Sequence, residues 1–155
     1  MRRYDTVFFD LDGTITDSKP GIVRCIKYAL DAKGIPYTEA QLDGMVGPPF
    51  RVSMRGILGI KDGELIEELI RIYRGEYEAG GWRECTVYDG MRELLARLRE
   101  GGIRLAVATS KPLKFTVMML DSLGLSGEFA FIGGAESDSS HDSKVEVIRY
   151  VMQNL

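Results

Sequence analysis

The sequence predicts an α/β protein with a doubly wound, Rossmann-like parallel sheet that is interrupted by an inserted helical domain. Three observations predict this class. A buried apolar run at residues 4–10 is typical of a parallel strand. Residues 16–85 show helical periodicity and no strand signal. From residue 90 onward, helical stripes and short apolar strands alternate, which indicates a parallel sheet covered by helices.

The first strand is expected at residues 4–10, where Val7-Phe8-Phe9 supplies the apolar run. Ser18 is a suitable N-cap for the following helix, and Pro20 is tolerated in its first turn. Apolar residues then recur at helical spacing until Gly34, which ends the helix.

Three more helices are expected before residue 85. A weak helix is predicted at 38–44, and a short one at 50–58 follows the rigid loop Gly47-Pro48-Pro49. A longer amphipathic helix contains Leu65 to Tyr77 and ends at Gly80-Gly81. This part of the chain therefore reads as a helical insert.

The C-terminal part alternates helices with strands, and glycines close the first two helices. The predicted elements are, in order, a helical stripe at 91–98, a strand at 103–108, a helical stripe at 117–123, a strand at 129–132 and a helical stripe at 145–155. Residues 133–143 are expected to form a polar loop between the last strand and the last helix.

Composition limits the function classes. The 155 residues are 45% hydrophobic and carry a net charge of −3, and the 20 basic residues are scattered, so no nucleic-acid partner is expected. The apolar runs are too short to span a membrane. Cys25 and Cys85 are far apart in sequence and are expected to be reduced thiols, which favours a cytoplasmic location.

The chemistry begins at Asp10-Leu11-Asp12-Gly13-Thr14, directly after the first strand. Side chains at positions i and i+2 leave a strand on the same face, so Asp10 and Asp12 can converge. Gly13 permits a sharp turn at the carboxyl end of the strand, where open α/β sheets place their sites. Paired carboxylates there can hold Mg²⁺ or divide the work of nucleophile and acid/base.

Two further signals follow later strands. Thr109-Ser110-Lys111-Pro112 comes after strand 103–108, where hydroxyls and N–H groups at the start of a helix would bind an anion. Lys144 follows the last strand and its loop, at the start of the last helix. A carboxylate, a hydroxyl and an ammonium group are what phosphoryl transfer through an aspartyl-phosphate requires.

These three motifs in this order resemble the haloacid dehalogenase-type phosphohydrolases. The resemblance spans essentially the whole chain, because the insert at 16–85 is similar to that family's helical cap domain, with the core at 1–15 and 86–155. The segments around Thr109, Lys144 and Val46-Gly47-Pro48-Pro49 are similar to the phosphoglycolate phosphatase-like branch.

The resemblance implies roles for individual residues. Asp10 would be the nucleophile and a Mg²⁺ ligand. Asp12 would act as acid and then base, with its backbone carbonyl on the metal. Thr109 would bind the phosphoryl oxygens, and Lys144 would orient Asp10. The residues expected to contact phosphate or substrate are Gly13, Thr14, Ser110, Lys111 and Arg51.

Several of these residues have simpler interpretations. A solvated lysine is an equally good reading of Lys111, and a surface position is favoured for Arg51 and its neighbour Arg55. The acidic residues Asp138 and Asp142 could replace metal ligands, although a solvated loop is the favoured reading, and His141 is expected to be an exposed loop residue.

The chain departs from the family pattern after Lys144. The family's fourth motif, a Gly-Asp followed by further acids, has no match in the remaining residues, so the chain is expected to be truncated and its core to lack the last strands. In the family's sheet order a missing strand would lie beside strand 4–10. Self-association, such as a homodimer, through that exposed edge is therefore expected.

The sequence thus predicts a Mg²⁺-dependent phosphatase that acts on a small phosphorylated metabolite, with phosphoglycolate as the first candidate. Alternatives are a 5′-nucleotidase, a phosphoglucomutase-like enzyme of the same superfamily, or an inactive fragment that only binds phosphate or self-associates.

Overall fold

The computed structural model describes residues 4–135 and 143–155. The chain divides into two compact units. The first unit contains the residues up to Asp17 together with Cys85–Leu155, and the second contains Ser18–Glu84.

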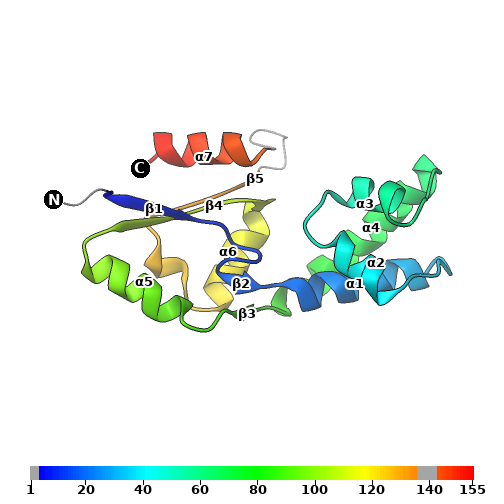
Figure 1. The fold of residues 1–155 in the computed structure, drawn as a ribbon, viewed down its shortest axis with the longest axis horizontal. Coiled ribbons are helices and arrows are strands. Elements are labelled where there is room, and N and C mark those ends of the chain that lie inside the picture. The colour runs from blue at the N-terminus through cyan, green and yellow to red at the C-terminus, as the bar shows by residue number, and fades with distance from the viewer. Residues whose placement is uncertain (1–3, 136–142) are drawn as a thin grey trace. The chain divides into compact units, whose positions relative to one another are not determined.

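The first unit is built on a parallel three-stranded sheet with the order β1-β4-β5. The strands are β1 (Thr6–Phe9), β4 (Arg104–Pro112) and β5 (Phe131–Ala135). Helices α5 (Met91–Glu100) and α6 (Leu113–Ser122) lie on one face, and α7 (Lys144–Gln153) lies on the other (Figure 1). A short 3₁₀ turn, η2 (Ser126–Glu128), precedes β5. The predicted α/β class with a parallel sheet covered by helices is confirmed.

The apolar residues of β4 explain its central place in the sheet. Five consecutive residues, Leu105 to Thr109, are buried, which is expected of a strand covered on both faces. Ala106 and Ala108 form a core cluster with Val147 and Val151 of α7. Their small side chains let this helix approach the sheet closely.

Two adjacent glycines place β5 between its helices. A Cβ atom at Gly133 would collide with the side chain of Val151 in α7. One at Gly134 would lie 2.7 Å from the Cα atom of Leu113 and 2.8 Å from the carbonyl oxygen of Lys111. Successive residues of a strand face opposite sides of the sheet. Gly133 therefore leaves room for α7 on one side, and Gly134 leaves room for the end of β4 and the start of α6 on the other.

The second unit is helical. It contains α1 (Lys19–Asp31), α2 (Glu39–Met45), α3 (Phe50–Gly56), α4 (Gly63–Ala79) and the 3₁₀ turn η1 (Gly81–Arg83). Thr38 and Gln41 form a capping box that begins α2, and the Asp62 carboxylate accepts hydrogen bonds from the first turn of α4. The apolar stripes of these helices meet in one core, which contains Ile26, Ala29, Leu30, Leu42, Met45, Met54, Ile66, Leu69 and Ile70.

Several expectations about strands differ from the structure. Residues 16–85 were expected to contain no strand, but β2 (Thr16–Asp17) pairs with β3 (Thr86–Val87) in a short antiparallel ribbon. Such short strands carry no measurable alternation of polar and apolar residues. Strand β4 continues to Pro112 instead of ending at 108, and β5 extends to Ala135 instead of 132. These extensions consist largely of polar and glycine residues, which carry no strand signal in the sequence. Such segments form strands only because a neighbouring strand pairs with them.

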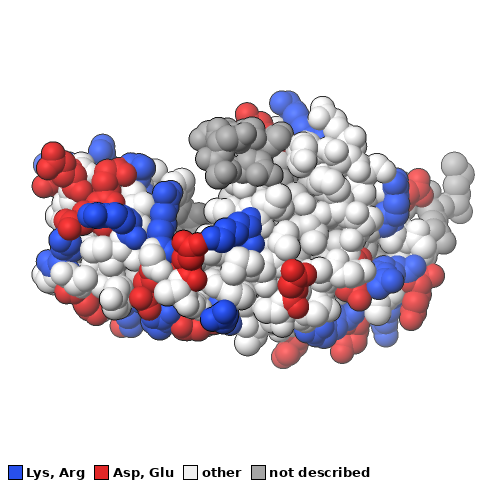
Figure 2. Space-filling model, turned by 180° about the vertical axis from the view of Figure 1, so that it is seen from behind, with Lys and Arg blue, Asp and Glu red and all other residues white. Residues whose placement is uncertain are grey.

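The surface and the helices add two observations. On the face shown in Figure 2, Lys and Arg side chains are interspersed with Asp and Glu and form no single basic field. Among the residues that the structure describes, no helix is both long enough and apolar enough to cross a membrane.

Candidate active site

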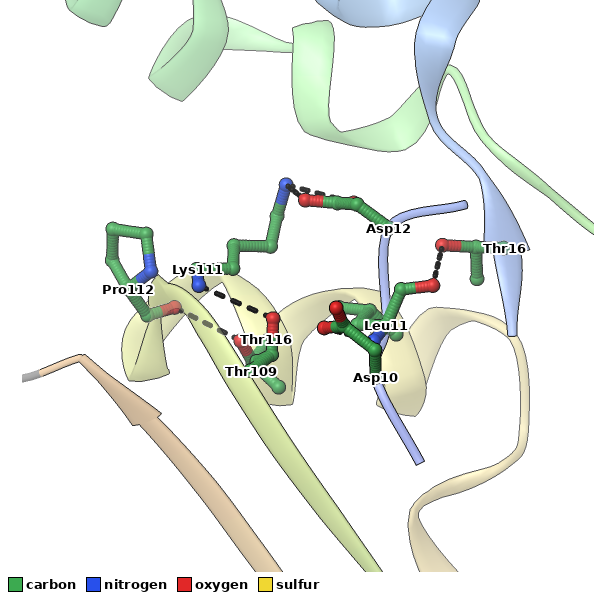
Figure 3. Close-up of polar contacts among 8 residues, drawn as sticks. All are labelled: Asp10, Leu11, Asp12, Thr16, Thr109, Lys111, Pro112 and Thr116. Carbon is green, nitrogen blue, oxygen red and sulfur yellow. Dashed lines mark hydrogen bonds and ion pairs between the residues drawn. The ribbon is translucent and has the colours of Figure 1, made fainter. Parts of the chain in front are cut away.

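The candidate site lies where β1 and β4 end, as neighbours in the sheet. Phe9 of β1 pairs with Val107 of β4 in parallel register, so the residues that follow both strands emerge at the same edge. Figure 3 shows Asp10, Asp12, Thr109 and Lys111 gathered there. The predicted convergence of these motifs at the carboxyl ends of the strands is visible in this arrangement.

The loop after β1 is fixed around one carbonyl oxygen. The backbone N–H groups of Thr14, Ile15 and Thr16 donate to the oxygen of Leu11 at 3.2, 3.0 and 3.1 Å. Gly13 has a φ of 76°, a left-handed conformation that favours glycine. Leu11 and Ile15 are fully buried and anchor the loop in the core. The position of Asp12 is therefore determined by backbone hydrogen bonds and by packing on both sides.

Asp10 is the first residue after β1 and contacts two donors. The N–H of Leu11 donates to its Oδ1 atom at 2.8 Å, and its Oδ2 atom forms an ion pair with Lys144 Nζ. Lys144 begins α7, whose start is set by a capping box between Ser143 and Glu146. The N-cap therefore places the Lys144 ammonium group beside Asp10.

Asp12 forms a two-oxygen ion pair with Lys111. Lys111 Nζ lies 2.9 Å from Oδ2 and 3.2 Å from Oδ1. The Lys111 side chain is only 7% exposed, whereas that of Asp12 is 33% exposed. The reading of Lys111 as a solvated lysine is therefore wrong. Its pairing with Asp12 could be anticipated only from the shared sheet edge.

Thr109 is buried near the end of β4. Its Oγ1 atom accepts a hydrogen bond from the N–H of Lys111 at 3.2 Å. Ser110, between them, is exposed. This segment was expected to begin a helix, but it belongs to β4, and the register shifts between Ala108 and Pro112. The Thr109 hydroxyl is therefore positioned by the end of a strand and not by the start of a helix.

Other predicted site residues are placed differently. Gly13 and Thr14 are exposed in the loop after β1. Arg51 belongs to α3 of the helical unit, where it forms an ion pair with Glu67. Asp138, His141 and Asp142 lie outside the described residues.

Cys85 is a residue of this neighbourhood that the sequence did not indicate. It is partly buried, and burial raises the pKa of its thiol. The positive charge of Lys111 lowers that pKa and the negative charge of Asp12 raises it, but burial has the largest effect. The thiol is therefore protonated and a poor nucleophile at neutral pH.

The donor set suits a hard cation in part. The Asp10 carboxylate and the Asp12 peptide carbonyl are oxygen ligands of the kind that Mg²⁺ prefers. Within residues 4–135 and 143–155, no group of three or more Asp, Glu, His or Cys side chains could enclose a metal. Mg²⁺ commonly keeps several waters and binds through one or two carboxylates and substrate phosphate, so the residues present fit such a site.

The sequence of this chain matches a known protein family. Residues 7–155 match the family of haloacid dehalogenase-like hydrolases. The chain belongs to this family. Within haloacid dehalogenase-like hydrolases, its relatives include phosphoglycolate phosphatases, which supports the branch that the motifs indicated.

Three relatives illustrate the similarity. The tyrosine-protein kinase PtkA of Mycobacterium tuberculosis is 43% identical over 150 residues, which are 96% of this chain and 50% of that protein. A PtkA structure superposes with a TM-score of 0.85 at 39% identity, covering 99% of this chain and 70% of the other. A 5′-nucleotidase of Pseudomonas aeruginosa is 35% identical over 153 residues, which are 98% of this chain and 69% of that protein.

The third relative is a phosphoglycolate phosphatase of Agrobacterium fabrum. It is 34% identical over 129 residues, which are 80% of this chain and 55% of that protein. This chain spans about half the length of PtkA and of this phosphatase.

Proposed function

We propose that this protein hydrolyses small phosphate monoesters in two steps through a phosphorylated Asp10. The observation that supports the proposal is the arrangement of two carboxylates, each paired with a lysine, at adjacent strand ends. Asp10 pairs with Lys144, and Asp12 pairs with Lys111. The separate pairing suits two carboxylates with different tasks.

In the first step, an Asp10 oxygen attacks phosphorus and the bond between phosphorus and the ester oxygen breaks. The leaving alcohol takes a proton from the Asp12 carboxyl group. In the second step, Asp12 removes a proton from water as the water attacks the phosphorus of the acyl phosphate. Phosphate leaves and Asp10 is again a free carboxylate, while Asp12 keeps the proton taken from water and passes it to the next leaving alcohol.

The neighbouring groups have supporting roles in this scheme. Lys144 holds the Asp10 carboxylate in place through its ion pair, and the Thr109 hydroxyl donates to a phosphoryl oxygen. Mg²⁺, held by the Asp10 carboxylate and the Asp12 carbonyl, would offset the charge on the phosphoryl oxygens.

The proposed substrate is phosphoglycolate, with a nucleoside monophosphate as the second candidate. The phosphoglycolate phosphatase and the 5′-nucleotidase relatives support these classes. We assign the helical unit Ser18–Glu84, expected from sequence at 16–85, to the cap that selects between them, with Arg51 as the candidate ligand of a substrate carboxylate. The protein is expected to act in the cytoplasm.

The test is phosphate release by this protein with Mg²⁺. The panel contains p-nitrophenyl phosphate, phosphoglycolate and several nucleoside monophosphates. Hydrolysis that disappears with a chelator and returns with Mg²⁺ supports the proposal. No release from any ester contradicts it. A kcat/KM at least about tenfold higher for one class, a difference of about 1.4 kcal/mol, assigns the substrate.

The similarity to PtkA favours a second candidate. That relative is named a tyrosine-protein kinase. The same phosphorylated Asp10 could transfer its phosphoryl group to a phenol oxygen instead of water. Incubation with labelled ATP and a tyrosine peptide distinguishes the two reactions, because transfer labels the peptide whereas hydrolysis releases only phosphate.

We also propose that the 155-residue chain self-associates through β1. Within the described residues, β1 pairs with β4 alone and is an edge strand of the sheet, a position where a strand of a second chain could pair. Light scattering is expected to show a mass that rises with protein concentration.

The variant Thr6→Lys tests the edge directly. A lysine on an edge strand discourages pairing between chains, and Thr6 lies outside the buried core. The variant is expected to shift the chain toward monomer. A parent chain that stays monomeric at every concentration contradicts this prediction.

The variant Asp12→Asn is expected to turn over substrate much more slowly than the parent. An amide cannot donate or accept the proton that turnover requires, but the backbone carbonyl of residue 12 remains. We therefore expect kcat to fall by about 10²–10⁴-fold, the usual share of acid–base catalysis. Inhibition by inorganic phosphate, which reports phosphoryl binding, is expected to change much less. An unchanged kcat contradicts the role of Asp12.

A further inference from the structure

We propose that Lys111 is a positioning residue that acts through Asp12, and that it is not a ligand of the substrate phosphate. This inference rests on the proposed function, since it gives Lys111 a part in the same two-step hydrolysis. It replaces the sequence-based expectation that Lys111 contacts the phosphate.

The ion pair is geometrically specific. Lys111 Nζ lies within hydrogen-bond distance of both Asp12 oxygens, at 2.9 and 3.2 Å. The lysine side chain is almost fully buried. Burying an ammonium group is costly unless it is paired. Asp12 supplies a negative charge to Lys111, and its own side chain remains accessible enough to meet a substrate.

The backbone of Lys111 is held from two sides. Its N–H donates to Thr109 Oγ1 at 3.2 Å. Its carbonyl oxygen faces Gly134 of β5, where a Cβ atom would come within 2.8 Å. The stem of the side chain therefore starts from a fixed point, so that the ammonium group is aimed at Asp12 before a substrate arrives.

This placement has a chemical consequence in the first step. As the proton passes from Asp12 to the ester oxygen, negative charge develops on the Asp12 carboxylate. A positive group 2.9 Å away stabilises that charge without reorganising. In the second step the same contact orients the carboxylate toward water. Lys111 thus supports proton transfer without touching the phosphoryl group.

Leaving groups reveal this role. An ester of an acidic phenol departs with little help from a proton, whereas an ester of a weakly acidic phenol needs the proton from Asp12. Removing Lys111 should therefore damage hydrolysis of phenyl phosphate more than hydrolysis of p-nitrophenyl phosphate. The two esters have similar shape, so a general loss of structure or of phosphate binding affects both alike.

The experiment compares Lys111→Met with the parent protein in the presence of Mg²⁺. We expect kcat/KM, which reports the step that releases the phenol, to fall about 10²-fold on phenyl phosphate, within the range of acid–base effects, and less than about tenfold on p-nitrophenyl phosphate. Lys111→Arg is expected to recover part of the loss, because it keeps the charge. Lys114→Met is the matched control: it removes an exposed lysine of α6 and should leave both rates unchanged.

A double-mutant cycle tests whether Lys111 acts through Asp12. In an Asp12→Asn background, Lys111→Met is expected to cost no further rate, because its target is already lost. A further loss of the same size in that background overturns the inference. Equal losses of kcat/KM on both esters overturn it as well, and a KM that rises alone on both esters assigns Lys111 to the phosphate instead.

The outcome is separable from that of the proposed function. If the parent hydrolyses no ester, the proposed function fails. If the parent is active and depends on Asp10, but Lys111→Met affects both esters alike, only the inference about Lys111 fails. Circular dichroism of each variant, with Lys111→Arg as the milder replacement, shows whether a lost rate reflects a lost fold.

Discussion

Asp10→Asn is expected to abolish hydrolysis and to leave the fold intact. An amide oxygen is a poor nucleophile and a weaker metal ligand than a carboxylate, so no phosphorylated intermediate can form. We expect kcat/KM to fall by more than about a thousandfold, since removing a nucleophile eliminates a reaction step. Phosphate release with p-nitrophenyl phosphate is the measurement, and the circular dichroism spectrum should match that of the parent.

The matched control is Asp5→Asn, an exposed aspartate just before β1. It makes the same chemical change near the other end of the same strand and should keep full activity. If Asp10→Asn retained a rate within about tenfold of the parent, the barrier would have risen by only about 1.4 kcal/mol, and Asp10 would not be the nucleophile.

Gly134→Ala is expected to destabilise the α/β unit strongly. The added Cβ atom would lie 2.7 Å from Leu113 Cα, 2.8 Å from the Lys111 carbonyl oxygen and 2.9 Å from the Leu113 nitrogen. All three are backbone atoms, so no side chain can move aside. We expect a loss of about 1–3 kcal/mol or more in the free energy of unfolding, measured by urea denaturation.

Two other glycine variants make the result interpretable. Gly127→Ala is the control, because a Cβ atom there has no neighbour within 4 Å. Gly133→Ala collides with the Val151 side chain instead, so adding Val151→Ala should recover part of its loss. No such partner exists for Gly134. Equal stabilities for Gly134→Ala and Gly127→Ala would show that β5 approaches the end of β4 and the start of α6 less closely than the structure places it.

The local pattern of residues was sufficient to predict much of this protein. The apolar run before Asp10, the spacing of Asp10 and Asp12, and the glycine that follows them specify a strand, a turn and a pair of carboxylates within a few residues. Helices such as α4 and α7 were recognisable for the same reason, because their caps and apolar stripes are formed by residues close together in the sequence.

The tertiary structure decided the contacts between distant segments. Asp12 and Lys111 are 99 residues apart, and only the pairing of β1 with β4 brings them together. The extension of β4 to Pro112 depends likewise on Ala135 of the neighbouring β5, because a polar segment becomes a strand only when a partner supplies its hydrogen bonds. Sequence alone therefore determined which chemical groups this protein carries, whereas the pairing of β1 with β4 determined that Asp12 meets Lys111.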